Sequence, residues 1–197
     1  MRRCLGRSGS KLLPQTRSRH VESEMITRIE KDDAESVAHD LADILHACVH
    51  DGASVGFILP FSKEAALGYW RNNVFPALPS GVTDLFVARV EGRVVGTVQL
   101  ISATMPNQPH RADVAKLLVH PDARRRGLGR ALMQALEARA AELGKTLLVL
   151  DTRSSDPSLI LYQGMGFQIA GEIPGYCRNP FENRYEPTTY MYKALES

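Results

Sequence analysis

Apolar residues in the first third of the chain recur at intervals that predict a short strand and then two helices. Residues 25–29 have strand character, and the apolar positions that follow recur every three or four residues. These positions are Val37, Leu41, Ile44 and Leu45. Asp32 or Asp33 can cap this helix, and Gly52 is expected to end it. Ser62 can cap a second helix that runs to about Asn73.

The centre of the chain predicts three antiparallel strands. Segments 84–90 and 94–102 flank the dipeptide Glu91-Gly92, which is typical of a tight hairpin turn. Residues 111–119 supply the third strand.

The second half of the pattern predicts helices alternating with strands. A long helix is expected over residues 127–143, and the wholly apolar run 147–150, which ends in Asp151, is typical of a buried central strand. Asp156-Pro157 can start another helix, because proline is favoured in a first helical turn. Residues 167–173 and 189–192 are predicted as the last strands, joined by a loop over 174–187.

Length and charge divide the chain into a tail and one domain. Residues 1–24 are rich in Arg and Ser and lack periodicity, which predicts a disordered basic extension before a single domain over 25–197. This extension carries six Lys/Arg and two Glu, so the net charge of +2 hides a domain with a net charge of −2. A basic nucleic-acid-binding domain is therefore not expected.

The remaining composition predicts neither a membrane protein nor a metal site. No apolar run approaches membrane-spanning length, and the three cysteines suit a reducing compartment, so a cytoplasmic location is expected. His46 and His50 could share one helix face, but Cys48 points away from it and no further ligand is evident. No metal site is predicted.

Residues 120–132, HPDARRRGLGRAL, join an apolar strand to the long helix and carry the strongest chemical signal. The free amides at a helix start attract an anion, usually a phosphate. Gly127 and Gly129 allow the backbone to approach that anion closely, and Arg124, Arg125, Arg126 and Arg130 add positive charge. The turn is interpreted as a pyrophosphate site, with an ordinary arginine-rich surface turn as the alternative.

Two common phosphate-binding motifs do not fit this turn. A dinucleotide fingerprint needs a small residue where Leu132 stands. A P-loop ending at Gly144-Lys145-Thr146 would need a glycine at Arg139, and the triplet follows a helix instead of starting one.

Two signatures resemble the GNAT superfamily of N-acetyltransferases. They are Arg124-x-x-Gly127-x-Gly129 and Leu161-Tyr162-x-x-x-Gly166-Phe167. The segments AxVxKLLVHPxARRRGLGRALM, LLVLDTR and IPGYC, with TTYMYKAL after them, are similar to the tabtoxin-resistance-type bacterial acetyltransferases. The resemblance implies an α/β (α+β) fold with a mixed, mostly antiparallel sheet of about seven strands, a splayed parallel pair and about four flanking helices.

The resemblance also implies acetyl-coenzyme A as co-substrate and a set of binding residues. The pantetheine arm would pair with the main chain of one strand, and the pyrophosphate would lie on the turn. Ser155 and Ser158 stand where many members have Asn and Ala, so a serine hydroxyl would replace an amide contact. The expected cofactor-binding residues are Leu117, Leu118, Val119, Arg124, Arg125, Arg126, Gly127, Leu128, Gly129, Arg130, Ala131 and Ser158.

Three residues are candidates for acid–base work on an amine. Asp113 and Asp151 would hold the ammonium and take its proton, and Tyr162 would donate to the departing thiolate. Each has a structural alternative: Asp113 as an exposed strand residue, Asp151 as a turn cap, and Tyr162 as a core phenol. Cys177 is a conceivable acyl acceptor, but it lacks a nearby histidine in sequence, which favours direct transfer.

The predicted function is acetyl transfer from acetyl-coenzyme A to a small cationic amine, with amino-acid-like compounds and toxins among the candidates. Acetylation of a protein α-amine or lysine is an alternative, as is a coenzyme A-binding module without chemistry. The expected partners are a small-molecule amine and, because superfamily members are often dimers, a second copy of the chain. Nucleic acid and membrane are not expected partners.

Overall fold

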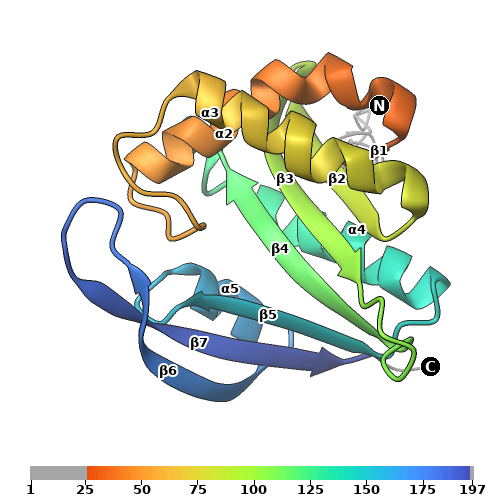
Figure 1. Ribbon diagram of the computed structural model, residues 1–197. Helices are drawn as coiled ribbons and strands as arrows, with labels where there is room; N and C mark the ends of the chain where they lie inside the picture. Colours follow the sequence, from red (N-terminus) through yellow and green to blue (C-terminus); the bar gives the residue numbers. More distant parts are fainter. Residues whose placement is uncertain (1–25, 196–197) are drawn as a thin grey trace, which may run out of the picture.

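A computed structural model describes residues 26–195, which form one seven-stranded sheet in the order β1-β2-β3-β4-β5-β7-β6 (Figure 1). All neighbouring strands are antiparallel except β4 and β5, which are parallel. The strands are β1 (Ile26–Ile29), β2 (Thr83–Val90), β3 (Arg93–Ser102), β4 (Arg111–Val119), β5 (Leu147–Arg153), β6 (Gln168–Arg178) and β7 (Tyr185–Ala194). The predicted fold is confirmed. The predicted extension over residues 1–24 lies outside the described residues.

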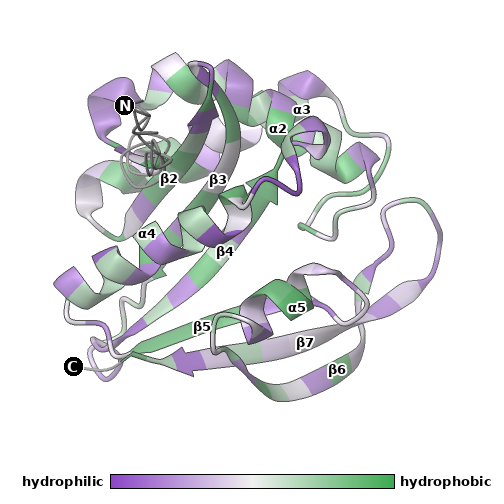
Figure 2. Cartoon of the chain, turned by 180° about the vertical axis from the view of Figure 1, so that it is seen from behind, coloured by the Kyte–Doolittle hydropathy of each residue, from purple (hydrophilic) through white to green (hydrophobic). Residues whose placement is uncertain are grey.

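Four α-helices cover the two faces of the sheet (Figures 1 and 2). α2 (Ala38–His50) and α3 (Lys63–Tyr69) lie on one face, and α4 (Leu128–Glu142) and α5 (Ser158–Gln163) lie on the other. A 3-10 helix, Lys31–Val37, leads into α2, and α3 continues as a π-helix over Trp70–Val74 and a 3-10 helix over Phe75–Ser80. No helix within residues 26–195 is long and apolar enough to cross a membrane.

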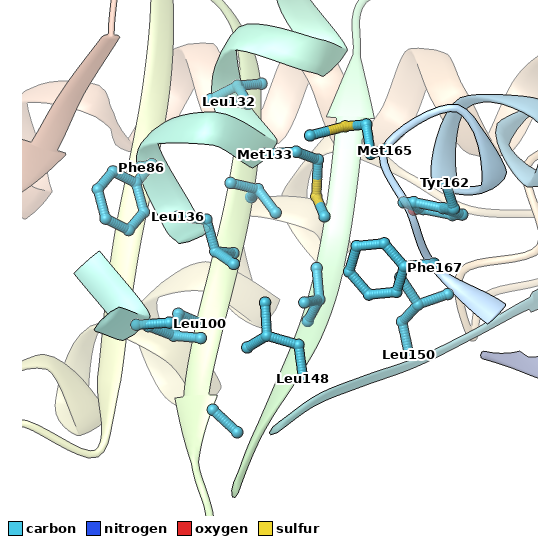
Figure 3. Packing of buried hydrophobic residues seen from close by; sticks show 14 of the residues in the cluster. Phe86, Leu100, Leu132, Met133, Leu136, Leu148, Leu150, Tyr162, Met165 and Phe167 are labelled. Atoms are coloured by element: carbon cyan, nitrogen blue, oxygen red, sulfur yellow. The ribbon is translucent and has the colours of Figure 1, made fainter. Parts of the chain in front are cut away.

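Two apolar clusters hold the layers together. Leu132, Met133 and Leu136 of α4 pack on the sheet, and Tyr162, Met165 and Phe167 extend this cluster beside β5 (Figure 3). Figure 2 shows apolar residues concentrated on β5 and α5, whereas α4 alternates apolar and polar positions. The second cluster lies under α2 and α3 and contains the fully buried Trp70.

Helix starts follow the sequence signals only in part. Ser62 caps α3 as predicted, with its Oγ accepting from the Ala65 amide at 3.1 Å. Asp32 and Asp33 do not cap α2, because the chain enters that helix through a 3-10 segment whose start has no side-chain cap. Instead the Ser36 hydroxyl donates to the carbonyl of Asp33.

The predicted loop over residues 174–187 is wrong. β6 and β7 continue through most of it, and only residues 179–184 connect them. β6 is an edge strand exposed along nearly its whole length, so it has no alternation of buried and exposed residues to signal a strand. Pairing with β7, interrupted between Ile169 and Gly171 and between Ile173 and Cys177, defines it instead.

The parallel pair is joined only at its beginning. β4 and β5 are in register from Arg111–Leu147 to Asp113–Val149, and no further pairs follow. Beyond this point β4 contains one extra residue relative to β3, and Lys116 has a φ of 52°. This bulge turns the end of β4 away from β5, so the two strands diverge toward their carboxyl ends (Figure 1).

Candidate active site

A cavity of about 800 Å³ opens where β4 and β5 diverge. Its walls come from the joint between α2 and α3, the second half of β4, the β4–α4 turn, the end of β5, α5 and β6. The lining includes residues 51–56, 114–119, 124–125, 151–153, 156–158, 161–162 and 176–177. Segments far apart in sequence thus meet around one hollow.

The β4–α4 turn presents a row of free amide groups at one end of this cavity. The amides of residues 125–130 donate no hydrogen bond to any described residue. Arg125 at φ 63° and Gly127 at φ 79° are both left-handed, a turn conformation that points successive amides toward one side. A Cβ added at Gly127 would meet nothing within 4 Å. This arrangement fits a pyrophosphate.

The Ala131 amide is not one of these free groups. Its amide donates to the carbonyl of Gly127 at 3.0 Å, closing the first turn of α4. The Leu128 side chain is buried in the core, so this residue can offer only its main chain. Gly129 lines the cavity, and a Cβ there would lie 3.3 Å from Leu161 of α5.

The four arginines of the turn point in different directions. Arg124 and Arg125 line the cavity, and Arg124 also donates to the carbonyl of Val119 at 3.3 Å and forms an ion pair with Asp51. Arg126 instead lines a separate hollow of about 320 Å³ beside α2, and Arg130 donates to the carbonyl of Gly164 at 3.3 Å. Arg126 and Arg130 thus do not line the cavity, and their contacts with the cofactor stay predictions.

Leu117, Leu118 and Val119 line the cavity on the diverging part of β4. Because β5 does not pair with them, their main chain on that edge is open, as the pantetheine prediction requires. Leu118 buries its side chain under α2, and the carbonyl of Val119 already accepts from Arg124.

Ser158 lies at the start of α5, across the cavity from β4. Asp156 Oδ1 accepts from the Ser158 amide at 2.8 Å, so the predicted start of this helix is confirmed. The Ser158 hydroxyl lies 2.9 Å from that of Thr152. Both residues line the cavity.

Asp151 and Tyr162 face the same cavity. Partial burial and the charge of Asp113 raise the pKa of Asp151, while Lys116 lowers it. Tyr162 is 6% exposed and its ring packs on Phe167 at a centroid distance of 5.8 Å. Burial raises the pKa of its phenol far above the ordinary value, so it stays protonated. Its hydroxyl has no hydrogen-bond partner among residues 26–195.

Asp113 lies at the edge of this arrangement. Its carboxylate accepts from Arg111 at 2.8 Å, and it is not among the cavity-lining residues. It still influences the site through its charge, which raises the pKa values of Asp151 and Tyr190.

Sequence reasoning missed three residues near Asp151. Lys116 and Tyr176 line the cavity, and the Tyr176 hydroxyl lies 2.7 Å from that of Tyr190. Hydrogen bonding to Tyr176 raises the pKa of Tyr190 to about 12. Lys116 had a signal, since a lysine interrupts the apolar run VAKLLV. Tyr176 and Tyr190 stand in the segments IPGYC and TTYMYKAL, but neither segment indicates that the two hydroxyls meet, because that contact depends on the pairing of β6 with β7.

Three aromatic residues that follow α2 belong to the core and do not line the cavity. Phe61 and Trp70 are buried under α2 and α3, and Phe57 packs on Phe61 at a centroid distance of 4.6 Å. Among residues 26–195, no group of three His, Cys, Asp or Glu side chains is placed to hold a metal ion.

The chain belongs to the GNAT acetyltransferase family, whose sequence profile matches residues 60–167. An uncharacterized N-acetyltransferase in the hisH-hisA intergenic region of Azospirillum brasilense is 34% identical over 119 residues, which are 59% of this chain and 68% of that protein. The enzyme is thus an N-acetyltransferase that uses acetyl-coenzyme A as donor.

Solved structures share the fold at low sequence identity. A ribosomal-protein-alanine N-acetyltransferase from Brucella melitensis aligns with a TM-score of 0.69 at 21% identity, over 87% of this chain and 99% of its own. A phosphinothricin acetyltransferase from Sinorhizobium meliloti, solved with AcCoA, aligns with a TM-score of 0.69 at 22% identity, over 86% and 87%. At these identities the likeness shows the fold alone.

Proposed function

We propose that this enzyme transfers acetyl directly to the amine of a small cationic acceptor. The observation that carries the proposal is the meeting of Asp151 and Tyr162 in one cavity, at the point where β4 and β5 part. A carboxylate draws an ammonium into such a cavity, and a phenol supplies a proton donor beside it.

The proposed cofactor site runs along one wall of the cavity. The free amides of residues 125–130 would hold the pyrophosphate, with Arg124 and Arg125 adding charge. The main chain of Leu117, Leu118 and Val119 would pair with the peptide-like arm, and Ser158 would contact it from α5. When bound, acetyl-coenzyme A supplies the activated thioester.

The two proton transfers are assigned to different residues. The ammonium must lose a proton before its nitrogen can attack, and Asp151 accepts this proton directly or through water. Its raised pKa brings it nearer to neutral pH than an ordinary carboxyl, which suits a general base. Tyr162 is protonated before the reaction, donates its proton to the sulfur as the C–S bond breaks, and regains a proton from the attacking nitrogen, which loses its second proton as the amide forms. The charge of Asp113 raises the pKa of Asp151.

Direct transfer is favoured over an acyl-enzyme. Cys177 lines the cavity, but its neighbour at 3.1 Å is the Ser54 hydroxyl. No histidine lines this cavity within the described part of the chain, so nothing there resembles the base that a catalytic thiol needs.

The contacts between the α2–α3 joint and the β6–β7 connection, called the roof from here on, favour a small acceptor over a protein. The α2–α3 joint, part of which lines the cavity, lies beside the β6–β7 connection (Figure 1), and the Leu59 amide donates to the carbonyl of Pro180 at 3.1 Å. Arg153 donates to the carbonyl of Gly52 at 3.1 Å, and a Cβ on Gly52 would lie only 2.8 Å from the Phe181 ring. A folded protein or long peptide would have to separate these contacts.

Which small amine is the acceptor is a question for experiment, because a shared fold does not determine the substrate. The resemblance to tabtoxin-resistance-type enzymes and the phosphinothricin acetyltransferase from Sinorhizobium meliloti suggest amino-acid-like compounds. A homodimer and a cytoplasmic location stay predictions.

The test is release of free thiol from acetyl-coenzyme A with a panel of small amines and a matched panel of peptides. We expect turnover of small amines and not of peptides. Asp151→Asn should reduce this turnover and leave the affinity for acetyl-coenzyme A unchanged. Turnover of peptides alone would replace the proposal with protein acetylation. Tight coenzyme A binding without turnover of either panel would indicate a binding module.

A further inference from the structure

Lys116 occupies a strained position on the acceptor side of the cavity. It lies in the β4 bulge with a φ of 52°, a left-handed conformation that lysine rarely adopts. Such strain persists where the surrounding structure maintains it, and it clusters at ligand sites. The bulge places the Lys116 side chain toward α3, where its Nζ lies 5.7 Å from the centre of the Tyr69 ring.

The Lys116 ammonium has no anionic partner in the fold. Among residues 26–195, no carboxylate lies within 4.0 Å of its Nζ, and no hydrogen bond to a described residue satisfies it. Lys116 and Asp151 both line the cavity, and no ion pair joins them. Burial lowers the pKa of Lys116, and the charge of Asp151 acts in the opposite direction. An unpaired ammonium removed from water is costly unless something else neutralises it.

Two other cations at this cavity are already engaged by the protein. Arg124 pairs with Asp51, and Arg153 donates to Gly52 and Glu186. Arg125 lines the cavity but belongs to the amide turn, at the end proposed for the pyrophosphate. Lys116 thus lines the same cavity as Asp151, where the acceptor amine is proposed to lie, and has no ion-pair partner among residues 26–195.

We infer that Lys116 binds a carboxylate of the acceptor, so that the substrate is a zwitterion whose ammonium faces Asp151 and whose carboxylate faces Lys116. This inference rests on the proposed function. A zwitterion of this kind places a charge of opposite sign beside each of the two charged groups, Asp151 and Lys116. An acceptor that lacks the carboxylate leaves the lysine unpaired, which gives specificity for the anion beyond attraction of the amine.

The test compares amino acids with their primary amides as acceptors, in the wild type and in Lys116→Met. Each pair keeps the amine and replaces the carboxylate with a neutral amide. Because the amide also lowers the pKa of the amine, the rates are compared over a range of pH. The wild type is expected to prefer the acid by about 10- to 100-fold in kcat/KM, the size of a hydrogen bond between charged groups. Lys116→Met is expected to abolish the preference by slowing the acid alone, and Lys116→Arg to restore part of it.

Controls separate this role from others. Lys63→Met removes a lysine from the surface pair with Asp43 and should leave the acid preference unchanged. Equal loss on acid and amide in Lys116→Met would overturn the inference in favour of a role in proton transfer or packing. A wild type without acid preference would also overturn it, whether or not the variants fold. If the wild type acetylates no small amine, the proposed function fails and this inference fails with it.

Discussion

Replacing Tyr162 with phenylalanine removes one oxygen atom and leaves the surrounding packing in place. The ring is held by Phe167 and the apolar cluster beside α4, which phenylalanine can fill equally well (Figure 3). The hydroxyl has no hydrogen-bond partner among the described residues, so its removal breaks no contact of the fold. The variant therefore separates chemistry from stability.

The two effects differ in size. A positioned proton donor accelerates a reaction by about 10²- to 10⁴-fold. At about 1.4 kcal/mol for each factor of ten, Tyr162→Phe should raise the barrier by about 3–5 kcal/mol. The free energy of unfolding should change by no more than about 1 kcal/mol, because no hydrogen bond within the protein is lost.

The assay follows free thiol under saturating acetyl-coenzyme A and acceptor, with calorimetric titration of acetyl-coenzyme A and a thermal melt on the same sample. Tyr192→Phe is the matched control, since its hydroxyl donates to Gln168 at 2.9 Å and is not among the cavity-lining residues. A Tyr162→Phe enzyme with kcat within threefold of the wild type would refute the donor role. An equal fall in the control would attribute the loss to packing.

Three further predictions concern the base, the amide turn and the roof. The kcat/KM of the wild type should fall as pH decreases through the pKa of Asp151, because only the ionised carboxylate accepts a proton. Burial raises this pKa, so the fall should begin at a higher pH than for an ordinary carboxyl. The fall should be absent in Asp151→Asn. Gly127→Ala, at φ 79°, should cost about 1–2 kcal/mol of stability and weaken acetyl-coenzyme A binding. Gly144→Ala, at φ 68°, should cost similar stability without affecting binding, and equal affinities in the two variants would contradict the pyrophosphate assignment. Arg153→Met should speed proteolytic cleavage of the α2–α3 joint, because the donor to Gly52 and Glu186 is lost; unchanged cleavage would show that the roof does not depend on this arginine.

Local signals in the sequence were most informative where one short segment builds one feature. The anion-binding turn is an example, since left-handed Gly127 and the first amides of α4 need only neighbouring residues to form. The hairpin at Glu91-Gly92 and the Ser62 cap formed as predicted for the same reason.

The sequence indicates less well which way a side chain points and which groups it contacts. Arg124, Arg125, Arg126 and Arg130 are predicted to contact one ligand, but only Arg124 and Arg125 line the cavity. Arg126 lines a separate hollow, and Arg130 donates to the carbonyl of Gly164. Asp113 and Asp151 lie on neighbouring strands as expected, but only Asp151 lines the cavity, because the strands pair at Asp113 and have parted at Asp151.

The sequence by itself determined the class of enzyme, the order of its elements, and the turn, acid and phenol on which the proposed chemistry depends, because these features are encoded in contiguous residues and their periodicity. Only the tertiary structure decided which side chains share the cavity. Lys116, Tyr176 and the roof contacts came together through a bulge in β4 and the pairing of β6 with β7, and such long-range strand pairing leaves no mark in any one segment.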